Sequence, residues 1–111
     1  MNEIKAKQYF VKMLDYITKA QKSIKGITYE QFVANDDKLF SASFVLSQIA
    51  ELAKNFSDEE KQKYPNIKWS ELRAIRNRII HDYDSVDFII LWNVIKDNLP
   101  QMARDIKQYI K

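Results

Sequence analysis

The sequence predicts an all-α protein, folded as an antiparallel four-helix bundle with a short extra helix. Its 111 residues include one Gly and two Pro, which leaves little room for the tight turns of β-hairpins. Apolar residues recur at spacings of three and four along several segments, as they do on the buried face of a helix. Residues that cap helix ends stand between those segments. The length suits a single domain over residues 1–111.

The first predicted helix carries a buried stripe and ends at a glycine. The stripe consists of Ala6, Phe10, Met13, Ile17, Ala20 and Ile24. Gly26 follows as a C-cap, because glycine adopts the left-handed conformation that often ends a helix. Thr28, with Gln31 three residues later, then has the form of a capping box, which predicts a short helical turn through Val33.

The next long helix is expected to begin at Asn35 or Asp36, both of which are good N-caps. Its apolar positions again step by three and four: Leu39, Ala42, Leu46, Ile49 and Ala53. Ser57 with Glu60 resembles a second capping box, and it predicts a polar helix of about one turn that stops near Pro65.

Two more helices complete the predicted bundle. One starts at Asn66 or Ile67 and carries Leu72, Ile75 and Ile79 on one face. The last contains the apolar series Phe88, Leu91, Ile95, Leu99, Met102, Ile106 and Tyr109. Since this series continues through Pro100, we expect one kinked helix or two abutting coaxial helices rather than a sharp turn.

The composition limits the possible functions. The chain has no Cys and one His, which excludes disulfides and thiolate zinc sites, so we expect no metal and no cofactor. The start MNEIKAKQYF lacks the apolar stretch of a signal peptide, and no run is long enough to span a bilayer, so a cytoplasmic protein is expected. The net charge of +3 permits contact with a polyanion. The many aromatic residues of so small a bundle favour a symmetric homodimer.

The stretch RNRIIHDYD, residues 76–84, contains the single histidine. On a helix Asn77 and His81 share a face, so the Asn77 amide could hold one imidazole nitrogen and fix the tautomer of the other. Arg76 is rotated by about 140° from His81, and it can join them only if the helix ends or loosens there. Arginine offers a planar fork that matches the oxygens of a phosphate, and histidine can exchange a proton near neutral pH.

These groups suit the transesterification of RNA, in which a base deprotonates a 2′-hydroxyl, a cation stabilises the phosphorane and an acid protonates the leaving oxygen. That reaction needs two proton-transferring groups, but the chain has one His. A twofold dimer would bring two copies of the stretch together. Tyr83 or Arg76 of the same chain is the alternative second group.

A plainer interpretation of the same residues also stands. A single histidine near a helix end is often a capping or surface residue, and Arg73, Arg76 and Arg78 could form a solvated basic face. Glu51, within the apolar QIAELA, would then be either exposed or paired with an arginine of the following long helix. The chain would be a structural or adaptor bundle.

Four segments resemble the HEPN superfamily, in particular its HepT-like toxin branch. RNRIIHDY, residues 76–83, is similar to the signature of that superfamily, with Arg76, His81 and Tyr83 at matching positions. SQIAELAK (47–54), YPNIKWSELRAIRN (64–77) and VDFIILWNVIKDNLPQMARDI (86–106) are similar to other elements of the branch. One departure is Ala50, where the family often has Gly.

The resemblance implies a four-helix bundle that dimerises with its motifs facing a shared cleft. It implies a metal-independent endoribonuclease toxin that acts on RNA rather than DNA, with Arg76 and His81 as the catalytic pair and Asn77 as a polar support. It also implies an antitoxin, a minimal nucleotidyltransferase of the MntA kind, which silences the toxin by transferring AMP to Tyr83. The alternative within the same superfamily is a non-catalytic helper subunit that binds a nucleotidyltransferase and its substrate.

Overall fold

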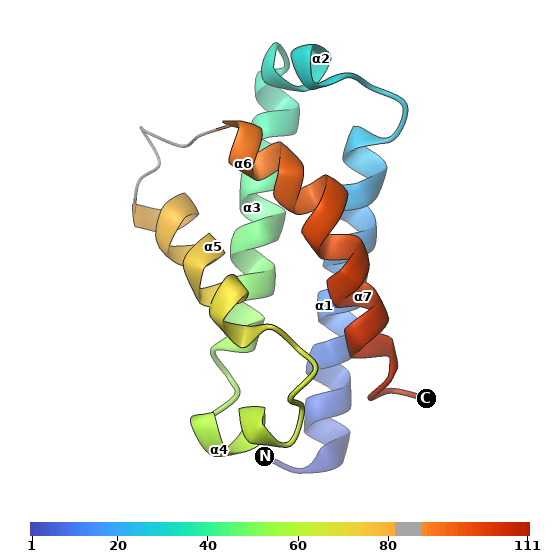
Figure 1. The fold of residues 1–111 in the computed structure, drawn as a ribbon, viewed down its shortest axis with the longest axis vertical. Coiled ribbons are helices and arrows are strands. Elements are labelled where there is room, and N and C mark those ends of the chain that lie inside the picture. Colours follow the sequence, from blue (N-terminus) through green and yellow to red (C-terminus); the bar gives the residue numbers. More distant parts are fainter. Residues whose placement is uncertain (82–87) are drawn as a thin grey trace.

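The computed structural model describes residues 1–81 and 88–111, without the side chains of residues 79–81. Throughout this described part the regular elements are helices, which confirms the predicted all-α class (Figure 1). In chain order they are α1 (Glu3–Ile24), α2 (Tyr29–Val33), α3 (Asp36–Ala53), α4 (Asp58–Gln62), α5 (Trp69–His81), α6 (Phe88–Asn93), the π-helix η2 (Val94–Asn98) and α7 (Leu99–Lys107).

The long helices alternate in direction, as expected of an antiparallel bundle. In Figure 1, α1 and α5 run up the page, whereas α3 and the final stretch from α6 to α7 run down it. The main packing contacts join α1 to α3 and α3 to α5, and α1 also packs on η2 and α7. Two short helices, α2 and α4, lie at opposite ends of the bundle (Figure 1).

The predicted helix caps are largely formed. At α2 both halves of the capping box are present, since the Gln31 amide donates to Thr28 Oγ1 (3.1 Å) and the Thr28 amide donates to Gln31 Oε1 (2.9 Å). Asn35 caps α3 by accepting from the backbone amide of Lys38 (3.1 Å). Gly26, two residues beyond α1, has a φ of 78°, the left-handed conformation expected of it.

The capping box predicted at α4 is only half formed. Ser57 Oγ accepts from the Glu60 amide (3.1 Å), as predicted. The Glu60 carboxylate, however, accepts from the Met1 ammonium (3.3 Å) instead of turning back to the cap. A positively charged donor is the stronger partner for a carboxylate, so the long-range contact replaces the local one.

An aromatic cluster fills one end of the core. The Phe10 ring lies 5.1 Å from that of Phe56, 4.9 Å from that of Tyr64 and 6.2 Å from that of Tyr109. These four residues come from α1, the segment after α3, the segment after α4 and the C-terminal end. The cluster therefore joins α1 to the two segments on either side of α4 and to the C-terminal end of the chain.

The start predicted for α5 was wrong by two or three residues. The helix begins at Trp69 rather than at Asn66 or Ile67. The Asn66 amide donates to the Tyr109 hydroxyl (3.1 Å), and its side chain donates to Gln108 Oε1 (2.9 Å). These bonds to the C-terminal segment hold the chain in a turn, and a prediction from local sequence could not include them.

The final helical stretch passes Pro100 without a break. Directly before the proline, η2 forms a π-helical turn in which the Leu99 amide bonds to the Val94 carbonyl, five residues earlier. Proline lacks an amide hydrogen and its ring crowds the preceding turn, and a widened turn relieves both problems. Leu91, Ile95 and Leu99 are all buried across this region, so the apolar face continues as predicted.

Candidate functional site

Arg76 lies on α5 and is held by a residue of α3. Its Nε donates to Glu51 Oε1 over 3.1 Å. This is its one hydrogen bond to a described residue, and it uses Nε, so within the described part of the chain the terminal amino groups of the guanidinium have no protein partner. Its side chain is 28% exposed, which leaves it within reach of solvent.

Glu51 contacts a candidate site residue, although the sequence did not place it in the site. The sequence left it as either exposed or paired with an arginine, and it is both, since its side chain is 42% exposed and bonded to Arg76. The bond from Arg76 lowers the pKa of this carboxyl, and Lys54, 3.5 Å away, acts in the same direction, against the effect of desolvation. Glu51 is therefore ionised at neutral pH, and its carboxylate remains a hydrogen-bond acceptor for the Arg76 guanidinium. The available signal was a single charged residue within the apolar QIAELA.

Asn77 lies on α5 with an exposed side chain. Position 81 follows it by four residues in the same helix, the spacing at which two positions share a face. Arg76 is about 100° around the helix from Asn77, turned toward α3 by its bond to Glu51. The structure therefore places Arg76 and Asn77 on adjoining faces of the last turns of α5.

Two predicted site residues fall partly or wholly outside the described residues. His81 is the last residue of α5, and its side chain is not described. Tyr83 lies within residues 82–87, which are not described. The contacts predicted between these side chains and Arg76 or Asn77 stay predictions.

The local sequence explains why α5 presents Arg76 at this point. Leu72 and Ile75 are buried and fix the inner face of the helix. At its start Trp69 Nε1 donates to the Tyr64 carbonyl (3.1 Å), and farther along Glu71 Oε1 accepts from Asn98 Nδ2 of η2 (2.9 Å). With α5 anchored at these points, the step from Ile75 to Arg76 turns the arginine toward α3.

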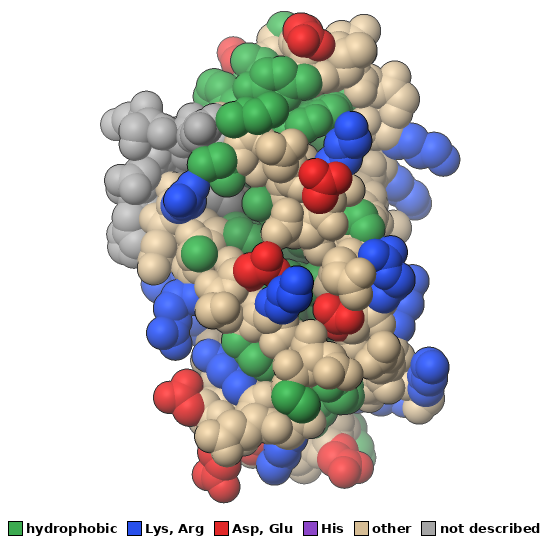
Figure 2. Space-filling view, viewed as in Figure 1, with side chains coloured by type: hydrophobic (Ala, Val, Ile, Leu, Met, Phe, Trp, Pro, Cys, Tyr) green, Lys and Arg blue, Asp and Glu red, His purple; other side chains and the backbone are tan. Residues whose placement is uncertain are grey.

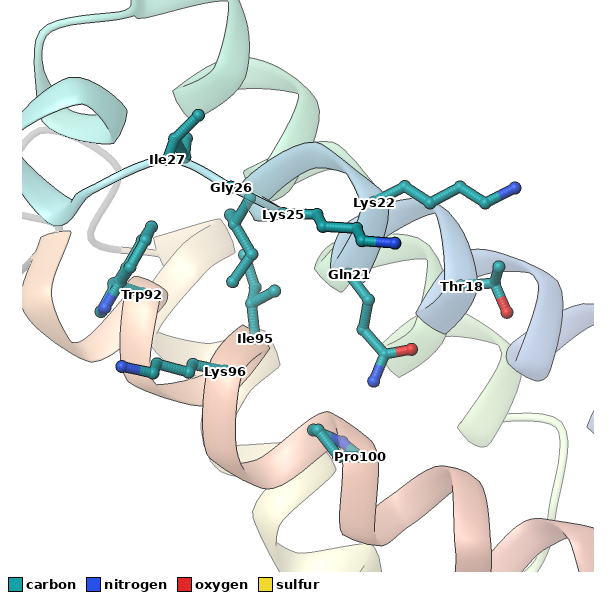
Figure 3. Close-up of a pocket in the computed structure, with 11 residues that line it drawn as sticks. Thr18, Gln21, Lys22, Lys25, Gly26, Ile27, Trp92, Ile95, Lys96 and Pro100 are labelled. Carbon is teal, nitrogen blue, oxygen red and sulfur yellow. The ribbon is translucent and has the colours of Figure 1, made fainter.

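A hollow that does not involve Arg76 lies between the end of α1 and the η2–α7 stretch (Figure 3). It measures ≈ 490 Å³, with Trp92, Ile95 and Ile27 among its apolar lining residues. Lys25 and Lys96 also line it, and they come from opposite sides in Figure 3. Neither Arg76 nor Glu51 contributes to this hollow, so it is separate from the candidate active site.

A comparison with known protein families shows which family this chain belongs to. The profile of the family described as ribonuclease HepT-like matches residues 13–109. The chain belongs to the ribonuclease HepT-like family. The match contains every candidate site residue, and it confirms the HepT-like resemblance of the sequence.

Several curated members of the HepT-like family are similar over most of their length. A protein of Methanocaldococcus jannaschii named "Putative RNase MJ1380" is 25% identical over 96% of this chain and 98% of its own. "Putative RNase TTE0752" of Caldanaerobacter subterraneus is 31% identical over 79% of both chains. "Probable ribonuclease HepT" of Thermococcus cleftensis is 28% identical over 86% of this chain and 87% of its own. No solved structure matches the chain.

None of the helices in the described part of this HepT-like chain combines the length and apolar character needed to cross a membrane.

Proposed function

We propose that this chain is a metal-independent endoribonuclease, the toxin of a toxin–antitoxin pair. The observation that carries the proposal is the guanidinium of Arg76, which is bound through Nε to Glu51 and has no further partner among the described residues. It lies about one and a half turns of α5 before the helix position of His81. Such a guanidinium is suited to bind the oxygens of a phosphodiester. The ribonuclease names of the relatives support the same class of substrate.

The proposed reaction is an attack of the ribose 2′-oxygen on the adjacent phosphorus. A base removes the proton of the 2′-hydroxyl, the new P–O2′ bond forms, the P–O5′ bond breaks, and an acid gives a proton to the leaving 5′-oxygen. The products are a 2′,3′-cyclic phosphate and a 5′-hydroxyl. His81 takes part in proton transfer, Arg76 stabilises the charge that develops on the phosphorane, and Asn77 orients the imidazole.

A homodimer would supply the second set of groups that this reaction needs. On α3, Phe40 and Phe44 are 58% and 59% exposed, and by helical register they share a face with Glu51. Hydrophobic side chains gather at the end of the molecule where α2 and α6 meet (Figure 2). A second copy seated on this α3 face would bury the two phenylalanines and lie beside Arg76, so the two motifs would share one cleft.

Regulation by a nucleotidyltransferase completes the proposal. An antitoxin of the MntA kind would transfer AMP to the hydroxyl of Tyr83, two residues after His81. Each added phosphate brings negative charge and bulk to the place where the RNA phosphate must bind. The modification would therefore block the site both sterically and electrostatically.

The test is cleavage of RNA in the presence of excess chelator. Wild-type protein should cut, whereas Arg76→Ala and His81→Ala should lose at least about a hundredfold in rate. Arg104→Ala is the matched control, since Arg104 lies on α7 and bonds only to Gln101 among the described residues. An RNA with a 2′-deoxy sugar at the cut position should resist cleavage.

Two results would contradict the proposed nuclease activity. Cutting that survives in both site variants would show that the activity belongs to a contaminant or to other residues. No cutting at any protein concentration, together with tight binding to a nucleotidyltransferase, would favour the non-catalytic helper subunit.

A further inference from the structure

An open hollow of ≈ 320 Å³ lies between α4 and the first turns of α5. It is lined by Asp58, Lys61, Gln62, Trp69, Ser70 and Arg73. The half-buried Trp69 is its large aromatic wall, and Lys61 Nζ lies 5.8 Å from the centre of that ring. The hollow thus combines an apolar wall with cationic groups, as sites for single-stranded nucleic acid do.

The charges of this hollow favour an anion. Arg73 is exposed and makes no ion pair with any residue in the part of the chain that the structure describes. Lys61 lies 4.0 Å from Asp58, whose side chain is 93% exposed, so the pair is weak and nearly neutral. The three charged groups sum to +1, and Arg73 supplies the charge that nothing in the described chain offsets.

Helical register connects the hollow to the candidate active site. Ser70, Arg73 and Asn77 follow one another at spacings of three and four along the outer face of α5, and position 81 is the next step. Eight residues separate Arg73 from position 81, a rise of about 12 Å. That distance corresponds to about three or four nucleotides of a stacked strand. Lys and Arg side chains lie along this edge of the molecule in Figure 2, beside the acidic ones of α4.

We propose that this hollow is a subsite for the RNA strand, about three or four nucleotides from the cut. Arg73 binds a phosphate of the strand, and Trp69 supports the neighbouring ribose or base. The inference rests on the proposed ribonuclease function and extends it, because it predicts that the enzyme also binds its RNA substrate at nucleotides beyond the scissile phosphate.

Cleavage of oligonucleotides of two lengths tests the subsite. One RNA extends six nucleotides on each side of the cut, and the other is a dinucleotide that contains only the scissile phosphate. Arg73→Gln should raise KM for the long RNA roughly tenfold, since a charge-assisted bond is lost, and should leave kcat within about twofold. The dinucleotide should be cut equally by both proteins. Asp58→Asn should lower KM for the long RNA, because it removes a repulsive carboxylate.

The hollow of Figure 3 provides a matched control. Lys25→Gln removes the same charge from a basic hollow that does not contain Arg73. It should change KM for the long RNA less than threefold, the general effect of a lower net charge. Equal effects of Lys25→Gln and Arg73→Gln would overturn the subsite, and so would equal effects of Arg73→Gln on the long RNA and the dinucleotide.

A binding measurement separates failure of the subsite from failure of the nuclease. Fluorescence anisotropy with the labelled long RNA is carried out in a His81→Ala background, which needs no cleavage. Arg73→Gln should weaken binding and reduce the slope of log K against log salt by about 0.7, the value for one phosphate contact with a single strand. An Arg73-dependent slope without cleavage in the wild type would support the subsite and refute the nuclease. An unchanged slope would refute the subsite.

Discussion

Arg76 and Glu51 are joined by a 3.1 Å hydrogen bond from Nε to Oε1, between helices α5 and α3. The bond uses Nε of the guanidinium, and no residue in the described part of the chain binds the two terminal amino groups. α3 therefore fixes the direction of a cation that belongs to α5, although neither partner is fully buried.

Loss of Glu51 should impair catalysis more than stability. Glu51→Ala leaves the guanidinium without its anchor, so we expect kcat to fall roughly tenfold as the orientation of Arg76 loosens. Glu51→Gln keeps an acceptor oxygen and should recover part of the rate. Single-turnover kinetics measures both. Glu59→Ala, at an exposed position of α4, is the control, and an equal loss there would contradict the positioning role.

The same pair predicts a pH dependence of stability. The bond from Arg76 lowers the pKa of Glu51 below its ordinary 4.5, so the folded state binds this proton less readily than the unfolded state. The stabilisation is complete above pH 4.5 and disappears as the pH falls through the lower folded value. Urea unfolding at pH values from about 3 to 7 should show wild type more stable than Glu51→Gln near neutrality, with the difference closing in acid. A difference that grows in acid would contradict this sign.

Phe10 should be among the most costly core residues to remove. It is 1% exposed and its ring contacts those of Phe56, Tyr64 and Tyr109. Phe10→Ala should lower the free energy of unfolding by about 3–5 kcal/mol, measured by urea denaturation. Val11→Ala changes the next residue, which is 50% exposed, and should cost less than about 1 kcal/mol. Similar losses in both variants would contradict the central place of the aromatic cluster.

The exposed phenylalanines of α3 predict the oligomeric state. Wild type should sediment as a dimer at micromolar concentration, and Phe44→Arg should sediment as a monomer, because a buried charge would oppose association. Ile4→Arg places the same side chain at a 71% exposed position of α1 and should leave the dimer intact. A monomeric wild type, or dissociation caused by Ile4→Arg, would show that this α3 face is not the interface.

Modification at Tyr83 can be separated from catalysis. After co-expression with a nucleotidyltransferase of the MntA kind, intact mass spectrometry should show increments of AMP that are absent from Tyr83→Phe. If the Tyr83 hydroxyl is only the acceptor of AMP, as proposed, the unmodified Tyr83→Phe protein should still cut RNA; loss of cutting would instead favour the alternative that this hydroxyl takes part in proton transfer. Adducts that persist in Tyr83→Phe would place the modification on another residue.

Local patterns predicted much of this fold because they report local physics. The Thr28 capping box and the Asn35 cap each depend on residues three positions apart, and both are present. The apolar stripes of α1 and α3 depend on steps of three and four residues, and they are buried except for Ile24 and Leu39, which are partly buried. The start of α5 and the second half of the Ser57 cap were wrong, since contacts with the two ends of the chain decide them. In the site, spacing indicated the relation of Asn77 to position 81, but the bond from Glu51 to Arg76 spans 25 residues and could be offered only as one of two alternatives.

The π turn at Val94–Asn98 has a consequence for length variation among relatives. A π turn holds one residue more than an α turn. The extra residue is taken up within the turn, so the buried face of the helix before it continues into the buried face of the helix after it. A homologue that lacks a single residue between positions 94 and 98 would therefore keep the buried faces of α6 and α7 aligned. A gap of one position at this point of a sequence alignment would indicate that the π turn has become regular α-helix, and the fold would be retained.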